Sequence, residues 1–174
     1  MVHSTLLAFI VCILLSSSLV LSQIAVPQTQ VDTIDASIQS LLLDSKFQTD
    51  YSSYIPFNVP TCAEAKVKYP TTNPFASRKT IRACYESDAV FPWLNVFQLV
   101  GNGIVRMINQ QYGVSLSAEF LALNTSSLGF FNTMKKAVYD GSCDVCVSNT
   151  TPTQVRKDQV KFQVGFLRWF LVHV

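Results

Sequence analysis

The pattern of hydrophobic and polar positions changes near residue 81, where short apolar runs begin to alternate with longer amphipathic stretches. Short apolar or alternating runs are typical of strands, and apolar residues that recur every three or four positions are typical of helices. The pattern predicts strands at 80–85, 114–123, 143–148 and 160–166. It predicts helices at 99–113 and 125–141, and a short helix or turn at 153–159.

Capping residues mark the expected ends of these helices. Gly113 follows the last periodic position of the first helix and is expected to end it. The second helix is expected to begin at a hydroxyl N-cap, which is Thr125, Ser126 or Ser127.

Strands that alternate with helices indicate right-handed crossovers and therefore an α/β fold. We expect a parallel open sheet with helices on both faces. Open sheets of this kind bind ligands beyond the carboxyl ends of their strands. The loops after Tyr85 and after Ser148 are therefore the places where a site is expected.

The residues before this region have a weaker pattern. Residues 31–54 fit one amphipathic helix with Asp32 or Thr33 as its N-cap, and residues 55–75 hold four prolines and fit an extended linker. The expected organisation is a signal peptide at 1–22, a leader at 23–80, an α/β lobe at 81–163 and an apolar tail at 164–174.

The N-terminal segment TLLAFIVCILLSSSLVLS, residues 5–22, is apolar and ends on small or medium residues. It predicts a cleaved signal peptide, and hence a secreted, extracellular or periplasmic protein. The region before it carries only His3 in place of the usual Lys or Arg. The alternative is a short uncleaved membrane anchor.

Cysteine and asparagine positions add expectations for an exported chain. Without Cys12 the chain keeps four cysteines, which allow three pairings that the sequence does not distinguish: Cys62, Cys84, Cys143 and Cys146. Two sequons, beginning at Asn124 and Asn149, are candidates for glycosylation in a eukaryote.

Charge and motif spacing argue against several classes of function. The formal net charge is +2 and the basic residues are scattered, so we expect no nucleic-acid partner. The pair Cys143-x-x-Cys146 lies in a strand pattern, whereas a redox pair is expected to open a helix. A zinc site needs two more ligands than this pair supplies. We therefore expect a protein that is not an enzyme and that uses no metal or cofactor.

The polar turn after residue 148 has the composition of an anion site. Pro152 biases the residue before it away from helix, and Thr153 is a candidate N-cap for the next helix. Free backbone N–H groups at such a start favour a negative ligand. Arg156 follows one turn later, and its guanidinium suits a carboxylate. The alternative is an ordinary helix cap followed by a solvated arginine.

The run YDGSCDVCVSNTTPTQVRKDQVKF, residues 139–162, resembles the pattern of the family 3 extracellular solute-binding proteins, which have the type II periplasmic binding protein fold. In that pattern an Asp near a strand start leads through a polar turn to T-x-x-R and a Phe. Asp144, Thr153, Arg156 and Phe162 stand at the matching positions. Upstream, IRACYESDAVFPWL resembles the first strand with its aromatic-Pro loop, and the resemblance covers about residues 81–163.

The resemblance implies a ligand-binding role for six residues. Arg156 would bind a ligand carboxylate, Thr151 would assist it, Asn149 would line the pocket, Glu86 would meet an ammonium, and Phe91 or Trp93 would stack on the ligand. Two of these have plain structural alternatives, since Glu86 also fits a surface position and Trp93 a core position. A glycan on Asn149 is hard to combine with a place in the pocket wall.

The function implied is binding of an amino acid or other small carboxylate by a secreted solute-binding domain. Family members close two lobes around the solute, and this chain holds about one, resembling the N-terminal lobe. The expected partners are the solute, a membrane transporter and a second lobe. The alternatives are a truncated fragment that binds nothing or an interaction module, and, less favoured, a secreted redox or metal enzyme.

Overall fold

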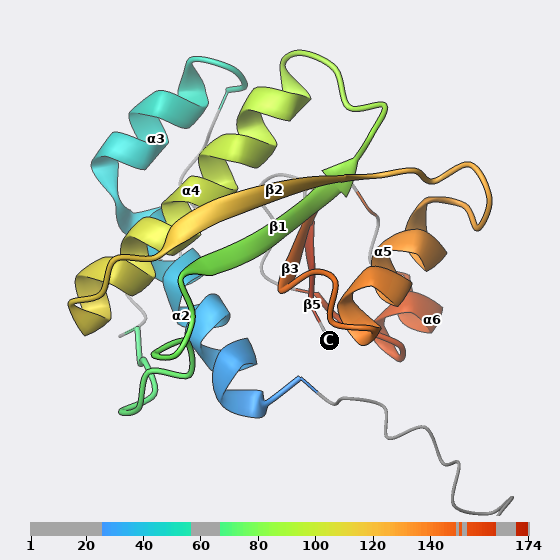
Figure 1. Cartoon of the computed structure of the whole chain (residues 1–174). Helices are drawn as coiled ribbons and strands as arrows, with labels where there is room; N and C mark the ends of the chain where they lie inside the picture. The colour runs from blue at the N-terminus through green and yellow to red at the C-terminus, as the bar shows by residue number, and fades with distance from the viewer. Residues whose placement is uncertain (1–25, 57–66, 149, 151–152, 163–169, 174) are drawn as a thin grey trace, which may run out of the picture.

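The structure is a computed structural model, and it describes residues 26–56, 67–148, 150, 153–162 and 170–173, the side chains of 161–162 and 170–173 excepted. Figure 1 shows a central sheet with helices packed against it. In chain order the elements are α2 (Gln28–Leu43), α3 (Ser45–Ser52), β1 (Thr80–Glu86), α4 (Trp93–Tyr112), β2 (Ser117–Leu123), α5 (Phe130–Tyr139), β3 (Val145–Ser148), α6 (Gln154–Lys157), β4 (Lys161–Phe162) and β5 (Phe170–His173).

The strands of the described residues form one sheet in the order β2-β1-β3-β5-β4. β1 pairs in parallel with β2 and with β3, which confirms the predicted α/β class with a parallel open sheet. β5 pairs antiparallel with β3 and β4, so the sheet is mixed at that side. Part of the expected apolar tail therefore forms a strand inside the sheet.

Helices cover both faces of the sheet, as predicted (Figure 1). On one face α4 packs on β1 and β3 and α2 packs on α4, in a main core that includes Ile34, Ile104, Ile81 and Val145. On the other face α5 packs through a second core that includes Met134 and three cysteines, Cys84, Cys143 and Cys146. Because strand side chains alternate between faces, odd-numbered residues of β1 and β3 face α4 and even-numbered ones face α5.

The expected leader packs on the expected lobe. Ile34, Ile38 and Leu41 of α2 are almost fully buried in the main core. Gly103 of α4 allows this approach, since a Cβ there would lie 2.7 Å from the Cδ atoms of Leu41. Helix α2 of the expected leader is thus part of the main core.

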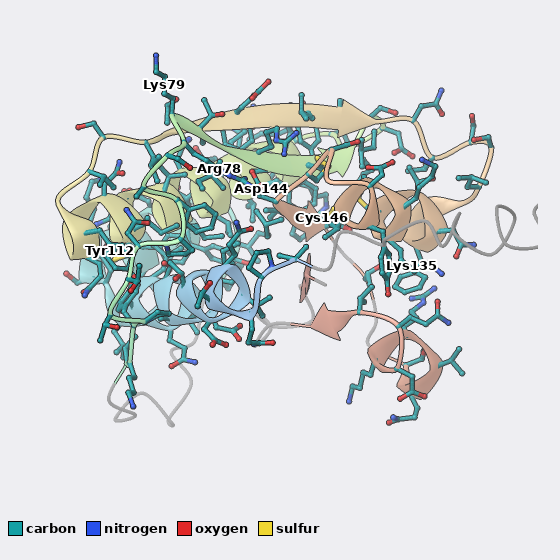
Figure 2. The ribbon with its side chains drawn as sticks, turned by 60° about the horizontal axis from the view of Figure 1, so that its bottom comes forward. Arg78, Lys79, Tyr112, Lys135, Asp144 and Cys146 are labelled. Carbon is teal, nitrogen blue, oxygen red and sulfur yellow. A yellow bond between two sulfur atoms is a disulfide. The ribbon has the colours of Figure 1, made fainter. Side chains whose placement is uncertain are left out.

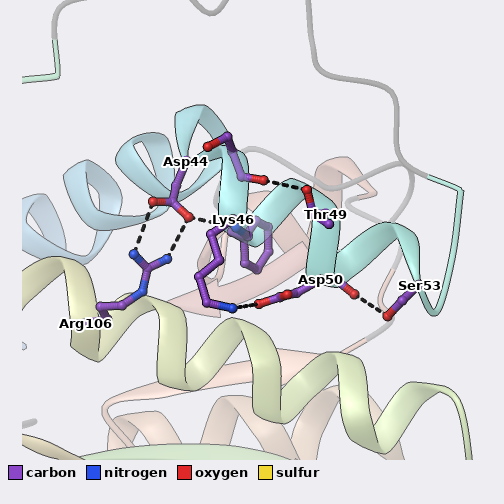
Figure 3. Close-up of polar contacts among 8 residues, drawn as sticks. Asp44, Lys46, Thr49, Asp50, Ser53 and Arg106 are labelled. Atoms are coloured by element: carbon purple, nitrogen blue, oxygen red, sulfur yellow. Dashed lines mark hydrogen bonds and ion pairs between the residues drawn. The ribbon is translucent and has the colours of Figure 1, made fainter.

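Asp44 divides the predicted single helix of residues 31–54 into two. α2 begins at Gln28 after Pro27, so Asp32 and Thr33 are not its N-cap. The carboxylate of Asp44 accepts a 2.7 Å hydrogen bond from the backbone N–H of Phe47 and caps α3. It also accepts two hydrogen bonds from Arg106 of α4, at 2.8 and 3.1 Å (Figure 3). These contacts fix the break between the helices.

Two further helix ends test the predicted caps. Gly113 ends α4 in the left-handed conformation at φ 64°, as expected. The prediction for α5 was wrong, because Gly129 at φ 72° precedes its first residue, Phe130. Residues 125–127 lie instead in a turn, where Asn124 Oδ1 accepts a hydrogen bond from the backbone N–H of Ser126. The backbone N–H of Ser126 is therefore hydrogen-bonded within this turn and does not belong to the first turn of a helix.

The predicted signal peptide lies outside the described residues, as does most of the tail at 164–174. No helix in the described part of the chain is long and apolar enough to cross a membrane.

A disulfide joins Cys84 of β1 to Cys143, just before β3. This bond belongs to one of the three pairings that the sequence left open, but the other bond of that pairing would join Cys62 to Cys146, whose thiol is free. Cys146 is a buried free thiol, and Cys62 lies outside the described residues.

Candidate functional site

Glu86 and Ser148 end two neighbouring parallel strands, β1 and β3. The register pairs Cys84 with Cys146. If the same parallel register is continued for two residues, Glu86 stands opposite Ser148. Both are even-numbered, so the alternation places both side chains on the α5 face. The carboxyl edge of the sheet thus carries a carboxylate beside a hydroxyl.

Each of these side chains has a buried oxygen without a hydrogen-bond partner in the described part of the chain. The atoms are Glu86 Oε2 and Ser148 Oγ. Ser148 is only 2% exposed. Buried polar atoms are nearly always paired, so an unpaired pair of neighbours indicates a place where a ligand or ordered water belongs.

Burial raises the pKa of Glu86 above its ordinary value, and the nearby charge of Asp88 acts in the same direction. A hydrogen bond from its own backbone N–H opposes the shift. A cationic group beside Glu86 would relieve the cost of its charge. The position therefore favours a positively charged partner.

Cys146 lies two residues before Ser148 in β3, so its side chain is on the same face of the sheet. Its thiol contacts the carbonyl oxygen of Met134 at 3.6 Å. Burial raises the pKa of this thiol, and the negative charge of Glu86 raises it further. The thiol is thus poorly suited to act as a nucleophile, since the thiolate is the reactive form.

The two aromatic candidates of the β1–α4 loop differ in position. Phe91 is 73% exposed, and its ring meets that of Tyr54 edge-on at 6.4 Å. It is accessible for stacking on a ligand. Trp93 begins α4, and its partly buried side chain packs against the main core. This position agrees with the alternative that Trp93 is a core residue.

Arg156 lies in α6 and contacts α5. Its guanidinium carbon lies 5.0 Å from the centroid of the Phe131 ring, a cation–π contact that holds the guanidinium. Lys135 lies 6.0 Å from the same centroid and donates a 2.8 Å hydrogen bond to Gln159, just beyond α6. Figure 2 shows Lys135 between α5 and α6. Phe131 is in the first turn of α5, so these contacts lie towards the carboxyl edge, where the chain leaves β2.

The turn before α6 is only partly described. Thr151 and Asn149 lie outside the described residues, and Thr150 between them is 3% exposed. Thr153 occupies the N-cap position of α6, as predicted, without a side-chain capping bond. α6 is only four residues long, so its dipole adds little to an anion site.

Asp144, which the resemblance highlighted, is at the opposite edge of the sheet. It is 7% exposed, pairs with the guanidinium of Arg78 and accepts a 2.8 Å hydrogen bond from the backbone N–H of Arg82. Figure 2 shows Arg78 and Asp144 side by side. These bonds tie the amino ends of β1 and β3 together, which is a structural role.

A groove of about 430 Å³ lies elsewhere, along α2. Its lining comes from α2 and from the segment at 68–70, and includes Asp32, Gln39 and Tyr69. It contains none of the six predicted site residues. Among the described residues no group of three or more His, Cys, Asp or Glu side chains is placed to hold a metal ion.

Sequence reasoning missed Ser148 as a side chain of the site. The signal was present, because Ser148 is a polar residue at the end of an apolar strand and two positions after Cys146 on the same face. Ser148 ends β3 as Glu86 ends β1, Phe91 lies in the loop after β1, and Arg156 lies in α6, which follows β3.

Comparison with family models, with curated proteins and with solved structures finds no match to this chain. The fold and the residues at the carboxyl edge are therefore the basis for a functional proposal.

Proposed function

We propose that this chain binds a small carboxylate-bearing solute, such as an amino acid, at the carboxyl edge of its sheet. The observation that carries the proposal is the pair of oxygens on Glu86 and Ser148 that find no hydrogen-bond partner among the described residues. A carboxylate and a hydroxyl that accept hydrogen bonds suit an ammonium group. In an open α/β sheet this edge is the usual place for a ligand.

Arg156 supplies the complementary charge in the proposal. It is partly buried and its guanidinium stacks on Phe131, which limits its freedom before a ligand arrives. A preordered guanidinium loses less entropy when it donates hydrogen bonds to a carboxylate. Exposed Phe91 adds an apolar surface on the neighbouring loop. The resemblance to family 3 solute-binding proteins supports the same assignment, and export of the chain belongs to this proposal.

The experiment is isothermal titration of the purified chain with matched ligands. The panel holds an amino acid, the amine that lacks its carboxylate and the 2-hydroxy acid that lacks its ammonium. The wild-type chain should bind the amino acid more tightly than either analogue. Arg156→Ala should abolish the difference in affinity between the amino acid and the amine. Glu86→Gln should abolish the difference in affinity between the amino acid and the hydroxy acid. Lys157→Ala is the matched control, because Lys157 is an exposed neighbour of the same charge. Absence of heat with all three ligands, or equal effects of Arg156→Ala and Lys157→Ala, would count against the proposal.

A second candidate is an interaction module that docks a second α/β lobe on the same edge. Its support is the set of exposed large apolar side chains on the segments that follow β1, β2 and β3, which are Val90, Phe91, Leu128 and, in α6, Val155. Apolar side chains gathered at one edge favour association. Light scattering distinguishes the two candidates. An interaction module alone would associate through this edge and bind none of the small ligands.

A further inference from the structure

The loop after β2 presents the sequon Asn124-Thr125-Ser126. β2 is the edge strand of the sheet, and Asn124 is exposed directly beyond its last residue, Leu123. The side-chain oxygen of Asn124 accepts two hydrogen bonds from Ser126, one from the backbone N–H at 3.0 Å and one from the hydroxyl at 2.7 Å. The sequon is therefore folded into a compact turn.

This turn leaves the amide nitrogen of Asn124 available. Both bonds from Ser126 engage Oδ1, and within the described part of the chain no hydrogen bond of Nδ2 is found. An exposed asparagine in N-x-S/T on a surface loop is the substrate of N-glycosylation in secreted proteins.

We infer that Asn124 is an N-linked glycan acceptor. In the modification Nδ2 loses one proton and bonds to the anomeric carbon of an oligosaccharide carried on a lipid diphosphate. The bond between that carbon and the diphosphate oxygen breaks, and the lipid diphosphate leaves with the electron pair. The inference requires entry into the secretory pathway, as the N-terminal segment predicts, and it is independent of solute binding.

The second sequon provides an internal comparison. Asn149 lies outside the described residues, but its neighbours Ser148 and Thr150 are 2% and 3% exposed. A folded chain therefore presents the sequon at Asn124 on its surface, whereas the second is flanked by buried residues. Of the two, Asn124 is the site that we assign.

A glycan at Asn124 would cover exposed apolar surface. Leu128 in the same loop is 50% exposed, and among the strands that the structure describes β2 (Ser117–Leu123) pairs only with β1 and forms the edge of the sheet. Unprotected edge strands pair readily with other chains. A glycan at the end of β2 would keep this edge from associating.

The test is expression of the full chain in cultured eukaryotic cells, followed by peptide N-glycosidase treatment of the product. The expected result is a discrete step to higher mobility for the wild-type chain, with conversion of Asn124 to aspartate seen by peptide mass spectrometry. Asn124→Gln and Ser126→Ala should lose that step, and Ser126→Thr should keep it. Ser127→Ala and Asn149→Gln are the controls and should also keep it.

Two results would overturn the inference. One is a wild-type chain that shows no glycosidase-sensitive step, which includes a chain that does not enter the secretory pathway. The other is an unchanged pattern of steps in Asn124→Gln. All the substituted positions except Asn149 are exposed loop positions, and far-UV circular dichroism of the secreted variants checks that they fold.

Discussion

Glu86 and Ser148 close the carboxyl ends of two neighbouring strands, and each holds a buried oxygen without a hydrogen-bond partner in the described part of the chain. Such an arrangement costs stability in the absence of a ligand, because the charge of Glu86 is only partly solvated. Residues of binding sites are commonly less stabilising than alternatives would be, because they are needed for function.

Glu86→Gln should therefore raise the melting temperature at neutral pH. Burial raises the pKa of Glu86, so its ionisation destabilises the folded chain once the pH rises above the ordinary carboxyl pKa. Below that pH Glu86 is protonated in both the folded and the unfolded chain, so the difference in melting temperature between the variant and the wild type should vanish. Thermal unfolding at a series of pH values measures the difference. Glu119→Gln, at an exposed position on β2, is the control and should leave the melting temperature unchanged. A destabilised Glu86→Gln variant at pH 7 would contradict the account.

Asp44→Ala should destabilise the chain by about 1–2 kcal/mol, because it removes the cap of α3 and both bonds to partly exposed Arg106. The pKa of Asp44 in the folded chain is lowered, mainly by its hydrogen bonds with Arg106. The stability that ionised Asp44 contributes is therefore fully present above the ordinary pKa of 3.8, and it is lost as the pH falls through the lower pKa of the folded chain.

Urea unfolding measures this loss. Asp50→Ala is the control, since the pair of Asp50 with Lys46 joins exposed side chains on one helix (Figure 3). Such pairs contribute only a few tenths of a kcal/mol. Equal effects of the two substitutions would mean that the Asp44–Arg106 contact does not fix the break between α2 and α3.

The sequence predicted the helices and strands in which apolar residues recur at regular spacing. β1 and the end of α4 could be read directly, because Gly113 has the conformation that favours glycine. The break at Asp44 could not be read, since Leu41 to Leu43 continue the helical pattern and the pairing of Asp44 with Arg106 is a tertiary contact. The start of α5 was missed because residues 125–127 have the composition of an N-cap but bond within their own turn.

The candidate site was predictable in part. Parallel strands imply that the loops after β1 and β3 meet at one edge, and the resemblance proposed Glu86 as a site residue there. The stacking of Arg156 on Phe131 joins residues of two helices and leaves no local signal. The sequence predicted only an apolar tail at 164–174 and no strand at 170–173, because β5 finds its partners, β3 and β4, only in the folded sheet.

Replacement of both Cys84 and Cys143 by alanine should lower the free energy of unfolding by about 2–5 kcal/mol. The disulfide spans a sequence separation of 59 residues, and loss of such a crosslink gives the unfolded chain more freedom. Denaturant unfolding of the double variant measures the effect. The wild-type chain unfolded in the presence of a reductant should show the same loss, and an unchanged midpoint in both would contradict the observed pairing.

Cys146 should be inert in the folded chain. Burial and the neighbouring charge of Glu86 raise the pKa of its thiol, so almost no thiolate is present at neutral pH. Labelling with a thiol-specific disulfide reagent, followed by peptide mapping, should find Cys146 unmodified under native conditions and modified in denaturant. Rapid native labelling of Cys146 would show that the second core is open at this point.

The most direct test of solute binding at the carboxyl edge is an amide chemical-shift titration of the isotopically labelled chain with an amino acid. The account predicts saturable shifts at Glu86, Ser148, Thr150 and the residues of α6, and their loss in Arg156→Ala. Shifts confined to the α2 groove around Gln39 and Tyr69, or no shifts at millimolar ligand, would contradict it.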